Sequence, residues 1–268
     1  MMNNLDAYET LSKIRIQKPL VHHITNWVTI YDCANIVRII GGLPIMAHAP
    51  EECGYMTEIS DALVLNIGTL TTSLIDSMKI SAKSANQKGI PVILDAVGVG
   101  ATKFRDEKAL ELINECKIDV IKGNASEIGR LAGEDVRTKG VESTDVKIDL
   151  VETAKKLSKS KNGTVVITGV QDIVAHNDDV YIIKNGDEML SLFVGTGCMV
   201  TSVIGCFCGV EKNYPEAAAF ALVCFGIAAE LVEKEINTPS AFKERFFDKI
   251  FTLNKDNVLK MQKIVKII

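Results

Sequence analysis

The chain has 268 residues, of which 47% are hydrophobic and 24% charged, and its formal net charge is −4. This length predicts one large α/β domain over residues 1–268, and the negative charge gives no electrostatic footprint for nucleic acid or an anionic membrane. The N-terminus lacks the basic and apolar regions of a secretion signal. Seven scattered cysteines without Cys-x-x-Cys spacing indicate reduced thiols in a cytoplasm rather than disulfides or a zinc site.

The first fifty residues predict a helix, a strand and a second helix. Residues 5–17 have apolar side chains at helical spacing, residues 19–24 predict a short strand, and residues 27–40 predict a helix. Asn26 is the candidate N-cap of that second helix. An extended run at 43–46 precedes another helix start at 49–52. His22 and His23 have no third ligand at a recognisable spacing, so we expect packed or capping groups rather than metal ligands.

The middle of the chain alternates between apolar strands and helices. The strands are expected at 62–68, 91–95, 119–122 and 164–169, and the intervening helices at 70–88, 109–116, 125–132 and 150–158. Continuous apolar runs of this length are typical of parallel strands buried on both faces. Residues 133–149 are polar and uneven, which predicts a surface insertion. The segments 172–175 and 180–183 flank a turn and predict a β-hairpin. The pattern indicates a mostly parallel central sheet with helices on both faces.

A glycine-rich turn follows the hairpin. Residues 189–194 predict a strand, Gly195-Thr196-Gly197-Cys198 a turn, and the apolar run from Met199 a helix. The first N–H groups of that helix would form an anion site with Cys198 at its mouth, and the alternative is a tight turn with a buried thiol. Helices are expected at 199–210 and 215–236, followed by one or two amphipathic helices. The apolar segment 217–232 contains Glu230 and is too short for a membrane span, so we expect a packed core helix.

Polar residues gather where the parallel strands end. In open α/β sheets ligands bind beyond the carboxyl ends of the strands. Asp95 and Glu127 predict a Mg²⁺ site there, because Mg²⁺ favours one or two carboxylates with water and substrate phosphates; helix capping is the alternative for Glu127. Lys122 is either a cation for phosphates or a solvated loop lysine. Thr168 is a weaker candidate for contact with a nucleotide.

Several sequence blocks resemble the hydroxyethylthiazole kinase family, whose members have a ribokinase-like fold. They are PLVHHITN at 19–26, PIMA at 44–47 with Glu51-Glu52, NIGTL at 66–70, DAVGVGA at 95–101, KGNASEI at 122–128 and GTGC at 195–198. The blocks fall in the family's order over residues 19–210. Cys198 points to this family in particular, since most ribokinase-like kinases have Asp at that position. The chain departs from the family pattern at Ala96, usually proline, and at Phe193-Val194, usually Val-Thr.

The resemblance implies ATP-dependent phosphorylation of the primary hydroxyl of 4-methyl-5-(2-hydroxyethyl)thiazole in thiamine salvage. It implies catalytic roles for Gly195, Thr196, Gly197 and Cys198, thiazole binding by Asn26, Met46, Gly68 and Gly195, ATP binding by Lys122, Asn124 and Thr168, and Mg²⁺ binding by Asp95 and Glu127. It also implies a homotrimer with sites between subunits, in which parts of the 26–52 region serve a neighbour's site.

Other functions stay open beside this one. A hydroxymethylpyrimidine kinase or an ADP-dependent repair dehydratase has the same fold and is separated by substrate profiling. A non-catalytic nucleotide-binding protein is disfavoured by the presence of Asp95, Glu127 and the full glycine turn. A cysteine hydrolase is disfavoured because no His-plus-acid pair is placed by motif near Cys198. Whether Cys198 acts as a general base or only positions the alcohol also stays open.

Overall fold

A computed structural model describes residues 5–134, 138–139, 142–143 and 149–267. The N-terminal part contains α1 (Ala7–Gln17), β1 (Leu20–Ile24), α2 (Ile30–Ile40), β2 (Leu43–Ile45), α3 (Cys53–Glu58), β3 (Ala62–Asn66), α4 (Thr72–Lys88) and β4 (Val92–Asp95). It is followed by α5 (Lys103–Glu115), β5 (Val120–Asn124), α6 (Ala125–Leu131), β6 (Thr138–Lys139), β7 (Glu142–Ser143), α7 (Leu150–Lys161) and β8 (Thr164–Thr168). The predicted insertion at 133–149 lies largely outside the described residues.

The C-terminal part completes the sheet and its cover. It contains β9 (Asp172–His176), β10 (Asp179–Ile183), the 3₁₀ helix η1 (Glu188–Leu192), α8 (Thr196–Val210), α9 (Tyr214–Glu233), α10 (Pro239–Thr252), α11 (Lys255–Met261) and β11 (Ile264–Ile267). The central sheet has the order β11-β10-β9-β8-β5-β4-β3-β1-β2. Its pairs from β2 to β8 are parallel, and β9, β10 and β11 pair antiparallel. The predicted α/β fold with a mostly parallel sheet, including the hairpin, is confirmed.

The prediction of a strand at 189–194 is wrong. Residues 188–192 form η1, which starts with Asp187 accepting a hydrogen bond from the Met189 backbone N–H at 2.9 Å. The segment does not pair with the preceding strand β10, because β10 already pairs with β9 on one side and β11 on the other. Strand β11 itself was not predicted, because residues 255–268 look amphipathic and were expected to be helical.

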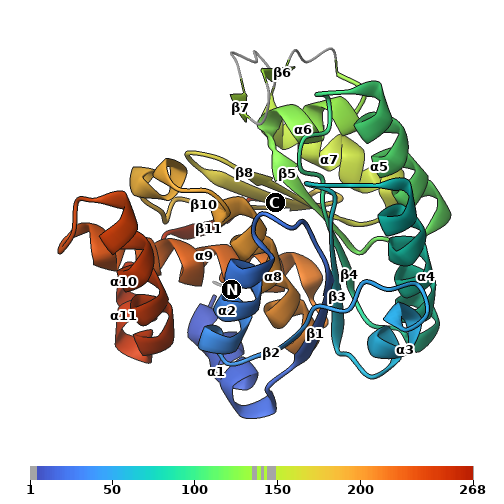
Figure 1. The fold of residues 1–268 in the computed structure, drawn as a ribbon. Coiled ribbons are helices and arrows are strands. Elements are labelled where there is room, and N and C mark those ends of the chain that lie inside the picture. The colour runs from blue at the N-terminus through green and yellow to red at the C-terminus, as the bar shows by residue number, and fades with distance from the viewer. Residues whose placement is uncertain (1–4, 135–137, 140–141, 144–148, 268) are drawn as a thin grey trace.

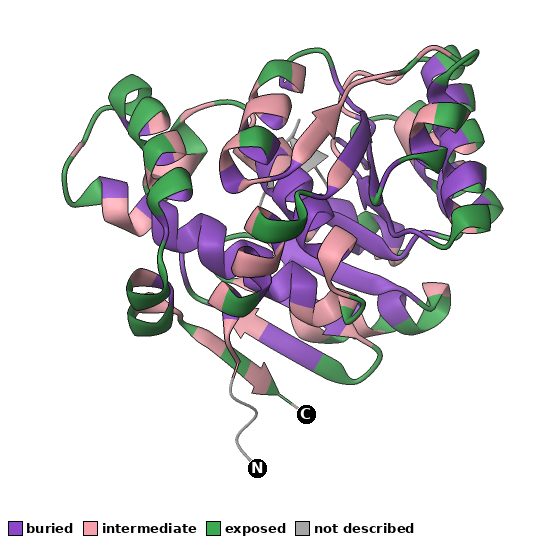
Figure 2. Ribbon diagram, turned by 90° about the horizontal axis from the view of Figure 1, so that it is seen from below, coloured by how far each residue is buried: buried purple, intermediate pink, exposed green. Residues whose placement is uncertain are grey.

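Helices cover both faces of the sheet (Figure 1). Between them and the strands lie two clusters of buried apolar side chains. Side chains alternate along each strand, so Val64 packs toward α8 while its neighbours Leu63 and Leu65 join the layer under α4 and α5. Figure 2 shows buried strands in the middle of the molecule and exposed residues on the outer helices. The continuous apolar runs of the sequence therefore reflect strands that are covered on both sides.

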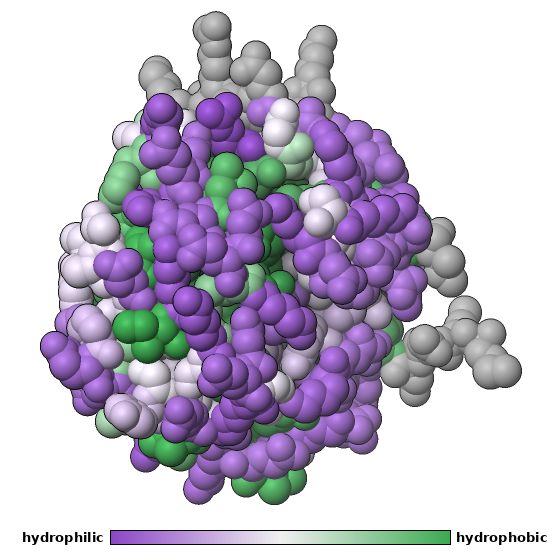
Figure 3. Space-filling view, turned by 90° about the vertical axis from the view of Figure 1, so that its right-hand side faces the viewer, coloured by the Kyte–Doolittle hydropathy of each residue, from purple (hydrophilic) through white to green (hydrophobic). Residues whose placement is uncertain are grey.

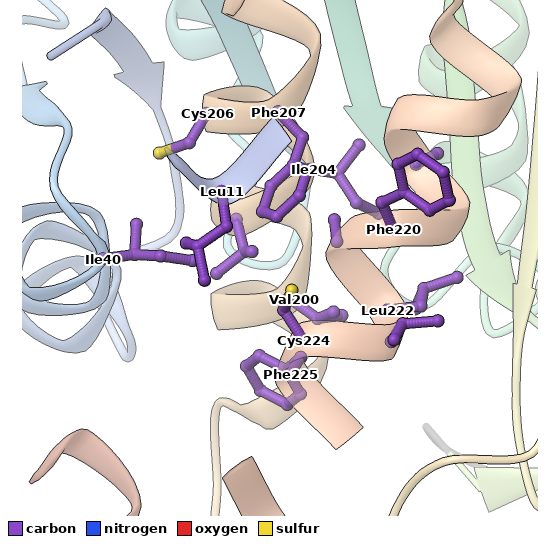
Figure 4. Packing of buried hydrophobic residues seen from close by; sticks show 14 of the residues in the cluster. Leu11, Ile40, Val200, Ile204, Cys206, Phe207, Phe220, Leu222, Cys224 and Phe225 are labelled. Carbon is purple, nitrogen blue, oxygen red and sulfur yellow. The ribbon is translucent and has the colours of Figure 1, made fainter. Parts of the chain in front are cut away.

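Helices α8 and α9 form the centre of one layer. Ile204 and Phe207 of α8 pack beside Phe220 and Cys224 of α9, with Leu11 of α1 closing the cluster (Figure 4). By length and composition α9 could cross a membrane, but 78% of its most apolar window is buried inside the protein. Helix α9 is therefore a core helix, as the sequence predicted. The face over α4 and α5 is mainly hydrophilic (Figure 3).

Candidate active site

A cavity of about 700 Å³ opens beyond the carboxyl ends of β1, β3, β4, β5 and β8. Its volume lies in the range of small-ligand sites. The predicted site residues that line it are Asn26, Gly68, Lys122, Asn124, Glu127, Thr168, Gly195, Thr196, Gly197 and Cys198. Met46 and Asp95 were predicted in the same site but do not line the cavity of this chain. The structure thus brings together segments from both halves of the sequence.

Asp95 and Lys122 form a buried ion pair on neighbouring strands. The two residues are in register between β4 and β5, and Lys122 Nζ lies 3.2 Å from Asp95 Oδ1. Asp95 is fully buried and also accepts hydrogen bonds from Asn66 Nδ2 at 2.9 Å and Thr201 Oγ1 at 2.8 Å. Lys122 donates at 3.1 Å to the carbonyl of Gly197. The alternative of a solvated loop lysine is therefore wrong.

Lys122 stays a cation in this setting. Burial by itself lowers the pKa of its ammonium group, but the carboxylates of Asp95 and Glu127 outweigh burial and raise the pKa above its ordinary value. Burial raises the pKa of Asp95, while Lys122 and the hydrogen bonds from Thr201 and Asn66 oppose that rise. The charged ammonium group of Lys122 is therefore held beside the first turn of α8, where it would attract the negative charge of a phosphate group.

Glu127 is both a helix cap and a cavity residue. Asn124 Oδ1 accepts from the Glu127 N–H at 2.9 Å, and Glu127 Oε2 accepts from the Asn124 N–H at 2.7 Å, which is a capping box at the start of α6. Glu127 Oε1 accepts from the Gly98 N–H at 2.7 Å. Burial raises the pKa of Glu127, with Lys122 opposing. The carboxylate is thus held rigidly at the cavity wall.

Asn26 connects β1, β3 and α8. Its Nδ2 donates to Asn66 Oδ1 at 2.9 Å and to Cys198 Sγ at 3.3 Å. Its Oδ1 accepts from the backbone N–H groups of Val28 at 3.1 Å and Thr29 at 3.0 Å. Helix α2 begins only at Ile30, with Thr29 as its cap, so the prediction of Asn26 as N-cap is wrong. Asn26 caps the turn before the helix and turns its amide toward the thiol.

Cys198 lies in the first turn of α8, half-buried at the cavity wall. Gly195 precedes the helix with φ of +103°, which a residue with a side chain rarely adopts, and starts the chain's turn into α8. Burial raises the pKa of the Cys198 thiol, Asp95 adds to the rise, and Lys122 opposes it. The thiol is therefore protonated near neutral pH, despite the helix N-terminus. The alternative of a merely buried thiol does not fit this exposure.

Sequence reasoning missed three polar residues of this site. Asn66 and Thr201 hold Asp95, and Arg105 lines the cavity from α5. Asn66 carried a signal, because it ends an apolar strand as Asp95 does. Arg105 carried none, since its helix is charged throughout and looks like a solvated surface helix. Thr201 is one threonine within an apolar helix, and only the fold places it against a residue 106 positions away.

The cavity wall is apolar where the chain enters α8. Phe193 lines the cavity and packs against the buried ring of Phe242, with the ring centroids 6.1 Å apart. Val28 and Val194 add apolar surface to the same wall. A site that combines a lysine, a helix N-terminus and apolar side chains can hold the phosphates of a nucleotide beside a small organic molecule.

Comparison with known proteins gives the same picture. The profile of the hydroxyethylthiazole kinase family matches residues 11–256. The chain is 54% identical over 254 residues to a hydroxyethylthiazole kinase of Methanosarcina mazei, covering 95% of this chain and 97% of the relative. It is 47% identical over 258 residues to one of Thermoanaerobacter pseudethanolicus, covering 96% of this chain and 98% of the relative.

Solved structures agree in fold. A hydroxyethylthiazole kinase structure from Pyrococcus horikoshii has a TM-score of 0.89 and 35% identity, and the match covers 97% of this chain and 98% of that one. A ribokinase-like superfamily protein from Enterococcus faecalis has a TM-score of 0.60 at 13% identity, over 93% of this chain and 90% of that one, which shows the fold alone. With its ribokinase-like fold, its cavity and its matches over nearly the whole length, the chain belongs to the hydroxyethylthiazole kinase family.

Proposed function

We propose that this protein transfers the γ-phosphoryl group of ATP to the primary hydroxyl of 4-methyl-5-(2-hydroxyethyl)thiazole, a step of thiamine salvage. The observation that carries the proposal is one cavity in which the first turn of α8, Lys122, Glu127 and Cys198 meet. The relatives named hydroxyethylthiazole kinase, matched over nearly their full length, support this substrate.

The residues supply alignment and charge stabilisation. The helix begins at Thr196, so its first N–H groups have no carbonyl partner within the helix and are available to the moving phosphoryl group. Lys122 lies beside Gly197 and offsets the negative charge on the phosphates. The alcohol oxygen forms the new bond to phosphorus as the bond to the ADP oxygen breaks. Because the transition state is loose, a strong base is not needed to start the reaction.

The acceptor alcohol is bound near Cys198, and ATP beyond the ends of β5 and β8. Asn26 orients the neutral thiol through its Nδ2 group, and the thiol positions the hydroxyl. Gly68 lies close against Asn26, where an added Cβ would come within 3.0 Å, so the backbone itself shapes this part of the thiazole site. Thr168 and Asn124, at the ends of paired strands, contact the nucleotide.

We propose that Mg²⁺ binds with ATP and is held through water by Glu127. Among the described residues, no three His, Cys, Asp or Glu side chains cluster closely enough to hold an ion alone. This fits Mg²⁺, which takes most of its ligands from water and phosphates. Glu127 lines the cavity, whereas Asp95 is fully buried, does not line it and is paired with Lys122, so Asp95 would act on the ion only at longer range. The ion would neutralise phosphate charge during transfer.

We propose a homotrimer with its sites between subunits, working in the cytoplasm. Trp27, which follows Asn26, and Tyr31 in the first turn of α2 are 50% and 76% exposed, and Val194 at the cavity wall is 70% exposed. These exposed apolar side chains support a subunit contact at this end of the cavity. Met46 directly follows edge strand β2 and does not line the cavity of its own chain, which fits a contribution to a neighbour's site. All seven cysteines are free thiols, which suits a reducing compartment.

The test of the activity is ADP release coupled to a reporter enzyme, with the thiazole alcohol and with hydroxymethylpyrimidine as acceptors. We expect turnover with the thiazole alcohol and at least tenfold less with the pyrimidine. Equal turnover with both, or turnover with the pyrimidine alone, would contradict the proposal. The trimer is tested by light scattering, which should give about three times the 29.2 kDa of one chain.

Shared sites are tested by mixing two inactive variants. Met46→Asp disables the residues that a chain contributes to its neighbour's active site. Gly197→Val disables the residues that a chain contributes to its own active site. In mixed trimers one site combines two intact parts, so activity should return on mixing after subunit exchange. No recovery from trimers shown to be mixed would place Met46 in its own subunit's site.

A further inference from the structure

We propose that Arg105 is a positioning residue that fixes the alcohol side of the active site relative to its metal and phosphate side. The inference rests on the proposed kinase function. Arg105 lies in the first turn of α5, where its backbone N–H donates to the capping side chain of Thr102 at 3.3 Å. The base of the side chain is therefore fixed, and its guanidinium group reaches the wall of the cavity.

The guanidinium group ties together two loops that leave neighbouring strands. Nη1 donates to the carbonyl of Ile67 at 2.8 Å and to that of Val97 at 2.9 Å, and Nη2 donates to the carbonyl of Gly68 at 2.7 Å. Ile67 and Gly68 follow β3, and Val97 follows β4. A planar, permanently charged group with five N–H donors can hold three carbonyls at fixed angles, which a lysine ammonium cannot do.

The first loop sets the alcohol side. The Gly68 N–H donates to Asn66 Oδ1 at 2.9 Å, the same oxygen that accepts from Asn26 Nδ2. An added Cβ on Gly68 would lie 3.0 Å from Asn26 Cβ, so the two backbones are already in close contact. Asn26 in turn donates to Cys198 Sγ at 3.3 Å. A shift of the Gly68 carbonyl is therefore passed on to the amide and the thiol that face the alcohol.

The second loop sets the metal and phosphate side. Gly98 follows Val97 with φ of +77°, and its N–H donates to Glu127 Oε1 at 2.7 Å. A Cβ on Gly98 would lie 3.1 Å from Arg105 Nη1, so the guanidinium group packs directly on this turn. Moving the turn would take the N–H away from the carboxylate. Arg105 thus holds Glu127 through Gly98 and Asn26 through Gly68.

This geometry predicts a defect of alignment rather than of binding. Phosphoryl transfer depends on placing the alcohol oxygen against the γ-phosphorus, and a misplacement of about 1 Å costs about 10²-fold in rate. Without Arg105 each half of the site keeps its own ligand contacts, but the distance between the halves is no longer fixed. We therefore expect kcat to fall while the KM values for ATP and the alcohol change little.

The experiment compares Arg105→Ala and Arg105→Lys with Arg130→Ala as a matched control. Arg130 lies on neighbouring α6, and its Nε contacts Asp106 Oδ2 at 2.9 Å in a partly exposed ion pair that does not line the cavity. Both Arg105 variants should lose about 10²-fold in kcat with each KM within about threefold of wild type. Free guanidinium at tens of millimolar should restore part of kcat in Arg105→Ala and change nothing in Arg130→Ala.

Each outcome decides the question. A kcat within about threefold of wild type in folded Arg105→Ala would overturn the proposal. So would a loss of kcat that is accompanied by a loss of thermal stability and is not restored by guanidinium. If Arg105→Ala does not fold, Arg105→Lys decides by the same split between kcat and KM. If the wild-type protein does not phosphorylate the thiazole alcohol, the proposed function itself is refuted. The wild-type measurement therefore separates that failure from a failure of the Arg105 proposal.

Discussion

Replacing Cys198 tests whether a protonated thiol or a thiolate serves the reaction. An ordinary cysteine, with a pKa of about 8.5, has only a few per cent thiolate at neutral pH. Here burial and Asp95 raise the pKa of Cys198 further, against the opposing effect of Lys122. The thiolate fraction is therefore smaller still, and a base acting through it adds little to the rate. We expect Cys198→Ala to keep kcat within about tenfold of wild type, which is less than the 10²- to 10⁴-fold typical of a lost general base.

The KM for the alcohol should carry most of the change. Removing Sγ removes the group that Asn26 Nδ2 contacts at 3.3 Å, so the alcohol loses a positioning contact while the phosphate contacts stay. Cys198→Asp should keep or raise kcat, because a carboxylate is mostly ionised at neutral pH and can accept the proton that a neutral thiol cannot. The same carboxylate would lie near Asp95 and should lower thermal stability through like-charge repulsion.

The assay is steady-state kinetics of the three proteins at saturating ATP between about pH 6.5 and pH 9. A thiolate base would make log kcat rise with pH toward the raised pKa, since the reactive form appears only as the proton leaves. A neutral positioning thiol leaves kcat of the wild type nearly flat over that range. A Cys198→Ala enzyme that loses more than about 10²-fold in kcat, combined with a rising wild-type profile, would refute the neutral-thiol reasoning.

Three further predictions address the metal, the helix start and the buried ion pair. Chelation should abolish turnover and magnesium should restore it, whereas zinc should not substitute well; full turnover in excess chelator would rule out the metal. Gly197→Val should lower kcat by about 10²-fold or more, because an added Cβ would lie 3.0 Å from Lys122 Nζ and displace it; a folded variant with normal kcat would show that the turn is only structural. Lys122→Met should cost about 3–5 kcal/mol of unfolding free energy near pH 7.5 by leaving Asp95 unpaired. In this variant Asp95 loses the group that opposes the rise of its pKa, so the folded-state pKa of Asp95 lies further above the unfolded value. A raised folded-state pKa adds stability at low pH that is lost as pH rises through it, so urea unfolding should show a smaller cost near pH 5.5 than near pH 7.5. A cost that does not change with pH would contradict this.

Much of the sheet could be predicted from the sequence because its signals are local. The mainly apolar runs at 62–66, 92–95 and 164–168 are strands, as expected, since a parallel strand covered on both faces buries apolar side chains on each of them. The segment 189–194 shows where this logic fails. Its residues favour a strand, but the place beside β10 is already taken by β11 from the end of the chain.

The positions of the site residues were also partly predictable. Strands that run in parallel end at one edge, so Asn124 and Thr168, which close β5 and β8, and Lys122, two residues before the end of β5, gather there. What the sequence cannot give is the partner of each group. That Lys122 is buried against Asp95, rather than solvated, depends on the register of β4 and β5 and on Thr201 of α8 reaching Asp95.

Local sequence patterns predicted most of the strands and helices, the family and many of the polar residues at the sheet edge, but not η1, β11, Thr201 or Arg105. The packing of distant segments sets the rest: burial and Asp95 raise the pKa of the Cys198 thiol, Gly98 holds Glu127, and Arg105 joins two loops. The physical reason is range. Periodicity and capping act over a few residues, whereas pKa values and hydrogen-bond partners depend on which distant segments the packed sheet and helices bring within a few ångströms of one another.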